Sequence, residues 1–147
     1  MIYTFAFNIH VLVSAITIAA GMVTITLSVR GLLGQREWGP VHRWSSLVFY
    51  ISLYLQLVLG FLIYVALRAS LESPLWEVPD TENDASLRFW AIEHIALMIF
   101  ALFLTQLGRV FVRRSSLSYW RFRASIFYYG ISLALILFSM SIALFFR

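Results

Sequence analysis

The sequence contains no cysteine and no lysine, and only 12% of its 147 residues are charged. Without cysteine the chain can form no disulfide, zinc ribbon, iron–sulfur cluster or covalently attached haem, and it has no thiolate nucleophile. Any metal must therefore be held by histidine, methionine, carboxylate or backbone groups. The low charge also argues against a soluble protein, because soluble domains consist of roughly one quarter charged residues.

Apolar residues are what the sequence has in abundance: they make up 61% of the chain and give it a mean hydropathy of +0.85. Four apolar segments reach the ~20 residues that a membrane-spanning helix needs. They cover about residues 3–29, 44–67, 88–108 and 124–146. We therefore expect an all-α membrane protein in which residues 1–147 form a single four-transmembrane-helix bundle. The first segment is too long for a signal peptide and lacks a basic start, so we expect the chain to retain it.

The arginines indicate how this bundle is oriented. The first and third connections with their flanks hold eight arginines and one acid, Glu37, whereas the second connection, residues 69–87, holds five acids. Cytoplasmic loops of membrane proteins are enriched in basic residues. We therefore expect the second connection and both termini on the outer, periplasmic side of a bacterial inner membrane. The distribution predicts contact with membrane lipid and no nucleic-acid partner.

The three histidines, His10, His42 and His94, carry the most informative chemistry. An imidazole inside a membrane segment has no water to solvate it, so it is paired or functional. His10 lies about seven residues into the first segment and His94 about six residues into the third. At ~1.5 Å per residue, both lie roughly 10 Å below the outer boundary. Gly60 on the second segment comes to the same depth.

Two imidazoles at one depth predict a non-covalently bound b-type haem, with His10 and His94 as the metal ligands. Gly60 would leave room for the macrocycle between the helices. Arg68 and Arg88 flank the outer ends of the second and third segments. Their charges would hold the haem propionates.

Other uses of the histidine pair stay open at this point. The two side chains could bind a single copper or zinc ion, form a hydrogen-bonded structural pair, or relay protons. Met140 comes near the same depth and could replace one histidine as a haem ligand. Glu93 points ~100° away from its neighbour His94 on a helix, so it cannot bind the same metal. It could instead hold the second ring nitrogen of a ligand, as could Asn8, a serine or a backbone carbonyl.

His42 lies near the cytoplasmic end of the second segment, too far along the helix to join the other two histidines. We expect it to contact lipid headgroups or to border a quinone pocket. Gln106 and Arg109 end the third segment on the same side and carry the same two interpretations. A quinone is therefore a second candidate cofactor.

Small and polar residues recur at helical spacing in every segment, which is typical of the packing faces of a membrane helix bundle. We expect these residues to face the bundle interior: His10, Ser14, Thr17, Gly21, Thr24 and Ser28 in the first segment, Ser45, Ser52 and Gln56 in the second, Ala91, His94, Met98, Ala101, Thr105 and Gly108 in the third, and Ser125, Ser132 and Ser139 in the fourth.

Three stretches carry a family resemblance: FWAIEHIALMIFALFLTQLGR, LQLVLGFLIY and FRASIFYYGISLALILF, together with the early histidine. The chain resembles the small four-helix membrane proteins of Bacteroidota-type bacteria that are catalogued as "cytochrome B" proteins. The resemblance covers most of the chain and implies haem binding, with His10 and His94 matching the family's histidines. The chain departs from the family at Leu55, where many members have a further histidine, and from Val11 onward.

Two functions from different classes follow. In the first, one haem passes electrons between a membrane quinol or quinone and a redox partner or larger membrane complex. In the second, the chain is a cofactor-free accessory subunit of a respiratory or photosynthetic complex. No residues for a stand-alone catalytic pocket stand out, so we expect an electron-transfer component more than an enzyme. Gly21 and Gly130 could allow close contact with another copy, which would make a homo-oligomer.

Overall fold

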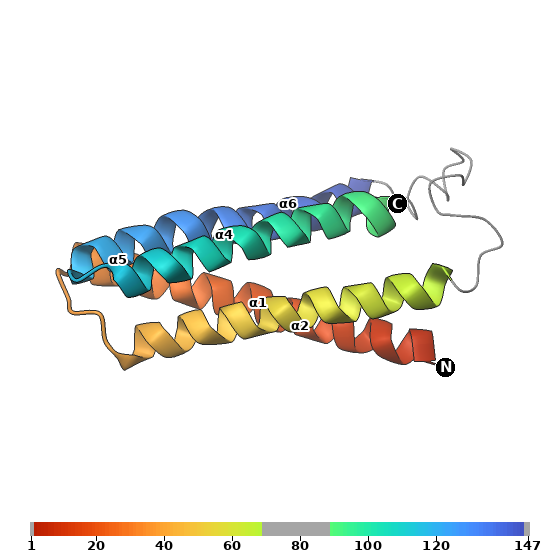
Figure 1. The fold of residues 1–147 in the computed structure, drawn as a ribbon, viewed down its shortest axis with the longest axis horizontal. Helices are drawn as coiled ribbons and strands as arrows, with labels where there is room; N and C mark the ends of the chain where they lie inside the picture. Colours follow the sequence, from red (N-terminus) through yellow and green to blue (C-terminus); the bar gives the residue numbers. More distant parts are fainter. Residues whose placement is uncertain (1, 69–88, 146–147) are drawn as a thin grey trace.

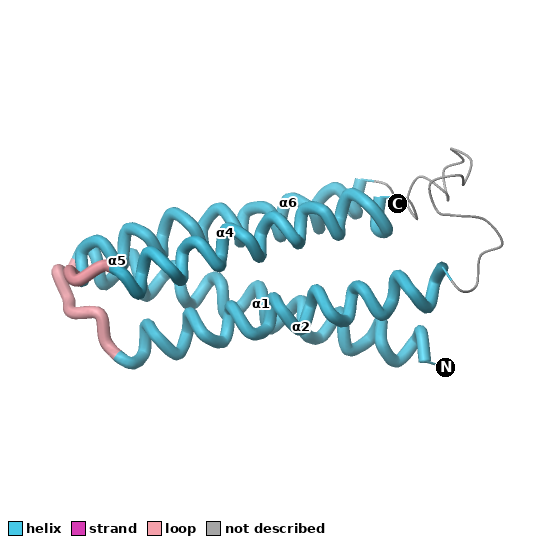
Figure 2. Tube along the Cα trace, viewed as in Figure 1, coloured by secondary structure: helices cyan, strands magenta, loops and turns pink. Residues whose placement is uncertain are grey.

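The computed structural model describes residues 2–68 and 89–145, and these residues fold into long helices joined by short turns (Figures 1 and 2). The first elements are α1 (Ile2–Leu33), α2 (Pro40–Arg68) and the π-helix η2 (Phe89–Glu93), which leads into α4 (His94–Arg114). The last described elements are α5 (Ser118–Ala124), the π-helix η3 (Ser125–Tyr129) and α6 (Gly130–Phe145), which follow one another without a break and together are called the last rod. The described residues contain no strand. Four helical segments are long and apolar enough to cross a membrane. The described residues are therefore all-helical, as the sequence predicts, and their four long apolar helices suggest a multi-pass membrane protein.

The helices extend further than predicted at the end that carries the arginines. α1 ends at Leu33 rather than near residue 29, and α2 begins at Pro40 rather than near 44. α4 continues to Arg114, and the last rod begins at Ser118 rather than near 124. Arginine favours helix, and its long side chain keeps the charge in water while the backbone remains helical. As a result, seven of the eight arginines of the first and third connections and their flanks lie on helices.

The four helices form a bundle with both chain termini at one end (Figure 1). We call this end the terminal end. The opposite end, which holds the two turns at residues 34–39 and 115–117, is the arginine end. α1 packs on α2 and α6, and α4 packs on the same two helices, so α1 and α4 lie diagonally across the bundle.

The interior of this bundle buries polar side chains alongside an apolar cluster centred on Phe49, Met98 and Tyr129. Most of the polar residues predicted to face inward are at most 8% exposed, namely Thr17, Thr24, Ser28, Ser52, Gln56, Thr105, Ser125, Ser132 and Ser139. Hydrogen bonds join several of them: Ser28 Oγ lies 2.8 Å from Ser125 Oγ, and Thr105 Oγ1 donates to Ser132 Oγ over 2.8 Å. The prediction was wrong at Ser45, which is half-buried, because the neighbouring Ser46 takes the buried position.

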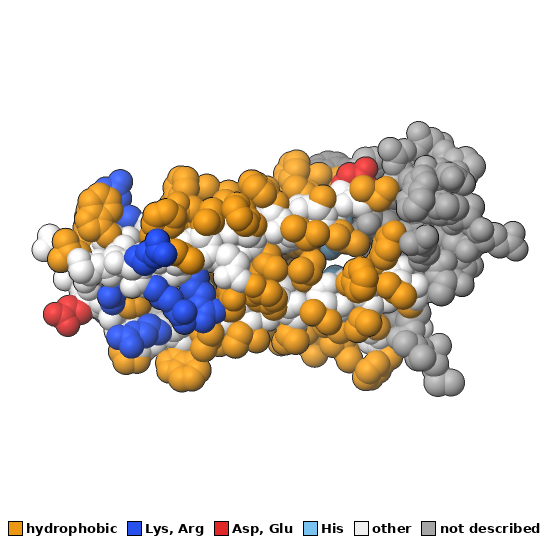
Figure 3. All heavy atoms as spheres, in the orientation of Figure 1, with side chains coloured by type: hydrophobic (Ala, Val, Ile, Leu, Met, Phe, Trp, Pro, Cys, Tyr) orange, Lys and Arg blue, Asp and Glu red, His pale blue; other side chains and the backbone are white. Residues whose placement is uncertain are grey.

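Large apolar side chains cover the outside instead. Phe5 is 69% exposed, Leu12 62% and Phe61 61%, and apolar atoms dominate the molecular surface away from the arginine end (Figure 3). In water this distribution would be unfavourable, but lipid tails solvate such side chains as well as a protein core does. The burial pattern therefore agrees with a helix bundle surrounded by lipid.

Glycines allow the closest helix contacts. A Cβ at Gly21 would lie 2.9 Å from the Phe49 ring, and a Cβ at Gly108 would lie 2.7 Å from Tyr128 Cβ. Gly21 thus faces the inside of its own bundle, which corrects the expectation that it could contact a second copy. A Cβ at Gly130 would meet nothing within 4 Å among the described residues.

Candidate functional site

His10 of α1 and His94 of α4 face each other across the bundle diagonal. Their ring centroids are 6.4 Å apart, and the ring planes meet at 72°. The two residues are 84 positions apart in sequence, and the structure brings them together at one level as the depth estimate predicts. His94 is the first residue after the π-helix η2, a feature that changes which way the following side chains point and that recurs at functional sites.

The ring of His94 is held by the neighbouring helix. Its Nδ1 lies 2.7 Å from Ser139 Oγ, and Ser139 on α6 is fully buried. A hydrogen bond at Nδ1 fixes the orientation of an imidazole and makes Nε2 the nitrogen that would bind a metal. Among the candidate partners that the sequence offers, the structure selects a serine.

The surroundings of His10 are incompletely satisfied. Its Nε2 lies 3.2 Å from Gln56 Nε2, and the same amide nitrogen hydrogen-bonds Ser14 Oγ. His10 Nδ1 and Gln56 Oε1 are both buried and have no hydrogen-bond partner within residues 2–68 and 89–145. Buried polar atoms without partners are costly. In this arrangement the Gln56 N–H donates to His10 Nε2, so the ring proton of neutral His10 is on Nδ1, where it has no acceptor among the described residues. If the Gln56 amide turned by about 180°, its Oε1 would accept from Nε2–H and leave the lone pair of Nδ1 for a ligand.

Gly60 opens space beside this ring. If Gly60 carried a Cβ, that atom would lie 3.5 Å from His10 Cε1 and would have no other described atom within 4 Å. The molecular surface is hollowed at this level between the two helix pairs, and histidine atoms border the opening (Figure 3). The predicted place of Gly60 at the depth of the histidines is thus correct.

The spacing of the rings suits a metal held by two imidazoles. An imidazole nitrogen binds such a metal at ~2.0 Å and lies ~1.2 Å from its own ring centre, so two collinear ligands have centroids roughly 6.4 Å apart. Within residues 2–68 and 89–145, no three His, Cys, Asp or Glu side chains come together. Zinc sites use three or four protein ligands, whereas haem brings four nitrogens of its own and takes one or two axial ligands from the protein. Among the described residues, two imidazoles are therefore the ligands on offer, a set that haem can use.

The other predicted site residues fall in three groups. Arg68 ends α2, but its side chain lies outside the described part, as does all of Arg88. Glu93 and Asn8 are exposed and do not hold the histidines. Met140 is 39% exposed on α6 next to the buried Ser139, so the face of α6 that meets the histidines presents a serine and not a thioether.

His42 has a role that the sequence interpretation missed. Its Nδ1 accepts a hydrogen bond from the Gly39 N–H over 3.2 Å. Its ring packs at a tilt against Trp38 and edge-on against Phe122, at centroid distances of 5.2 and 5.0 Å. His42 is the third residue of α2, so it closes the helix start in the way a capping-box side chain does. The signal was its position two residues after Pro40, which commonly begins a helix.

Two tyrosines near the arginine end were also missed. Gln106 Nε2 donates to Tyr50 Oη over 2.8 Å and also hydrogen-bonds Tyr54 Oη. The Arg109 guanidinium lies 4.2 Å from the Tyr50 ring centre. Tyr50 and Tyr54 are one helical turn apart on α2, and this spacing could have marked them as a pair facing the end of α4.

No family model, curated protein or solved structure matches this chain. The resemblance to the "cytochrome B" proteins and the haem itself therefore stay predictions that rest on the residues.

Proposed function

We propose that this chain is a membrane electron-transfer protein that binds one b-type haem through His10 and His94. The observation that supports this proposal best is the pair of imidazoles 6.4 Å apart inside a bundle that also buries polar side chains. Bound haem would supply a one-electron couple whose potential depends on its axial ligands and on their hydrogen bonds.

Each residue of the pair has a neighbour suited to that task. Ser139 would hold the His94 ring in one tautomer and orientation. Gln56 would do the same for His10 once its amide is turned so that Oε1 accepts from His10 Nε2–H. Gly60 would keep α2 clear of the macrocycle. We further propose Arg68 and Arg88 as the propionate partners, because they come at the terminal end of their segments.

The proposed topology places the terminal end on the periplasmic side of a bacterial inner membrane, since the arginine end would be cytoplasmic. One haem near one face cannot carry an electron across the bilayer alone: Arg109 lies fifteen residues beyond His94 on α4, or ~22 Å along the helix. We therefore propose a quinol or quinone in the membrane as one redox partner, and a periplasmic or membrane protein as the other.

The test is the absorption spectrum of the protein purified after expression with haem supplied. A reduced-minus-oxidised difference spectrum should show a b-type α-band at one haem per chain. His10→Ala and His94→Ala should each lose the band, whereas His42→Ala, which removes the histidine at the other end, should keep it. A colourless but helical wild type would overturn the proposal and favour the cofactor-free accessory subunit. A band that survives both substitutions would overturn the assignment of His10 and His94 as the ligands.

A further inference from the structure

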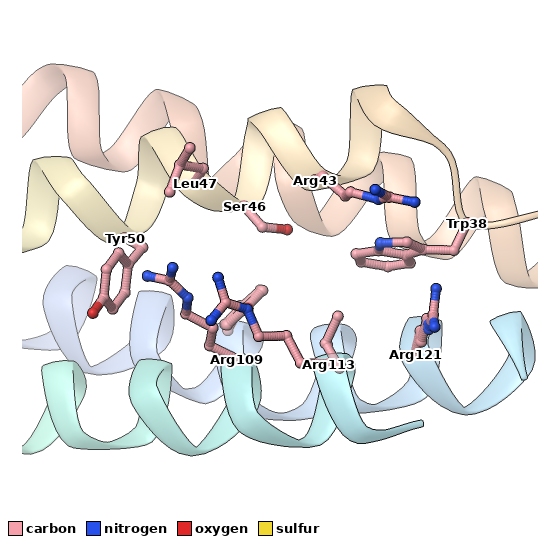
Figure 4. A pocket seen from close by; sticks show the side chains of 10 residues that line it. Trp38, Arg43, Ser46, Leu47, Tyr50, Arg109, Arg113 and Arg121 are labelled. Atoms are coloured by element: carbon pink, nitrogen blue, oxygen red, sulfur yellow. The ribbon is translucent and has the colours of Figure 1, made fainter. Parts of the chain in front are cut away.

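A second polar site lies at the arginine end, where a cavity of about 460 Å³ opens between α2 and α4. Four arginines line it: Arg43 from α2, Arg109 and Arg113 from α4, and Arg121 from α5. Figure 4 shows these side chains directed into the space between the helices, together with Ser46 and Tyr50 of α2. Arg109 and Arg113 are one helical turn apart, so both reach the same wall of the cavity.

The charge of this cavity is not compensated by the described part of the chain. The acids within residues 2–68 and 89–145 are Glu37 and Glu93, and neither lines the cavity. Converging like charges repel one another, and the repulsion is screened less at the half-buried Arg109 and Arg121 than at the exposed Arg43 and Arg113. An anion in the cavity would remove that repulsion.

Two of the arginines are also positioned in advance. The guanidinium of Arg109 lies 4.2 Å from the Tyr50 ring centre, and Arg121 Nε donates to the Ser115 carbonyl over 2.8 Å. A guanidinium held in place loses less entropy on binding, and its planar fork matches phosphate oxygens in pairs. The arrangement thus favours an oxyanion that can meet several guanidinium groups at once.

The volume and surroundings specify the anion further. A cavity of about 460 Å³ is much larger than one phosphate group and falls within the range of small-molecule sites, ~300–1,000 Å³. Apolar side chains, Leu47 and Val112, share its lining. The arginines gather toward one end of the apolar surface, among apolar side chains (Figure 3), a position that suits the level of lipid headgroups. A neutral quinone would leave the four charges unbalanced.

We propose that this cavity binds a phosphate-bearing anion, with the phosphate held by Arg43, Arg109, Arg113 and Arg121. The shared chemistry is a phosphate monoester or diester, which either an anionic phospholipid headgroup or a soluble phosphate can supply. The proposal stands apart from the haem site at the terminal end, so either can fail without the other.

Isothermal titration calorimetry of the full chain in a neutral maltoside detergent tests the proposal. The probes are short-chain phosphatidylglycerol, phosphatidylcholine with the same chains, inorganic phosphate and a short-chain quinone. We expect saturable binding of phosphatidylglycerol and a Kd at least about tenfold higher in the double variant Arg109→Gln/Arg113→Gln, because charge-assisted hydrogen bonds are lost. The matched control Arg114→Gln/Arg123→Gln removes the same charge from exposed arginines outside the cavity and should change the Kd by less than about twofold.

The results of this titration distinguish a phospholipid headgroup from a soluble phosphate as the bound anion. Competition by inorganic phosphate at similar concentration would support the site and assign it to soluble phosphates, whereas binding of the lipid alone would assign it to the headgroup. Equal weakening in both double variants would overturn the proposal, because it would indicate general attraction to a basic surface. Quinone binding that depends on the cavity, with no effect of any anion, would also overturn it. If the glutamine variant is not helical by circular dichroism, Arg109→Lys/Arg113→Lys keeps the charge, removes the paired geometry and should still raise the Kd.

Discussion

Gly108 lies where α4 packs against the last rod, and the distances there predict how much a larger residue would lower the free energy of unfolding. Gly108→Ala would place a methyl group 2.7 Å from Tyr128 Cβ and 2.8 Å from Tyr129 Cε1. Tyr128 Cβ is fixed to the backbone, so no rotamer change relieves that contact, and α4 must move. Overpacking of this kind costs ~1–3 kcal/mol.

Gly130→Ala is the matched control, because a Cβ there has no described neighbour within 4 Å. Both glycines are helical, so the gain in helix propensity, ~1 kcal/mol, is common to the two variants and cancels in their difference. We therefore expect Gly108→Ala to unfold ~1–3 kcal/mol more easily than Gly130→Ala. Reversible unfolding in mixed detergent micelles, followed by circular dichroism, measures the difference. Equal unfolding free energies would refute the tight packing of α4 against η3.

Three further predictions concern two polar contacts and Gly60. Ser28→Ala and Ser125→Ala, measured singly and together in a double-mutant cycle, should show a coupling energy of ~0.6 kcal/mol, the usual size for hydrogen bonds between membrane helices. If the two effects on the unfolding free energy simply add, the 2.8 Å contact between the serines contributes nothing to stability. His42→Ala should lower the unfolding free energy by ~1 kcal/mol through loss of the Gly39 cap, with haem binding unchanged. Gly60→Ala should keep haem, because its methyl group would lie at an ordinary contact distance of 3.5 Å from His10. Gly60→Leu should lower haem occupancy severalfold, because the larger side chain fills the opening. Equal haem occupancy in the two variants would show that Gly60 does not border the haem.

The fold was largely predictable because lipid and helix geometry leave few choices. Apolar length fixed the number of segments, and the spacing of Ser125, Ser132 and Ser139 predicted a face that is indeed fully buried. The helix ends were not predictable from hydropathy, since the bundle continues beyond the apolar run where arginines such as Arg113 remain helical. The π-helices were missed as well, because a single wide turn leaves no mark in residue spacing.

At the histidine pair, depth counting was enough to bring His10 and His94 together but not to name their partners. Ser139 was one of several inward serines, and only the three-dimensional register shows that it is the one within 2.7 Å of His94 Nδ1. Gln56 lies one turn from Gly60 on the same face of α2, so its contact with His10 could have been predicted from that spacing.

The arginine end shows the opposite case. The positive-inside rule uses these arginines only to predict which end of the bundle is cytoplasmic. It does not predict where their side chains lie relative to one another. Once α4 and α5 extend past the apolar run, Arg109, Arg113 and Arg121 hold fixed positions around one cavity.

The measurement that tests the central claim most directly is low-temperature electron paramagnetic resonance of the ferric wild-type protein loaded with haem. Two histidines on one iron give a six-coordinate, low-spin centre. We predict a single low-spin signal accounting for one haem per chain, replaced by a high-spin signal or lost in His94→Ala. A high-spin signal in the wild type, or a low-spin signal unchanged by His94→Ala, would contradict the pairing of His10 and His94 on one metal.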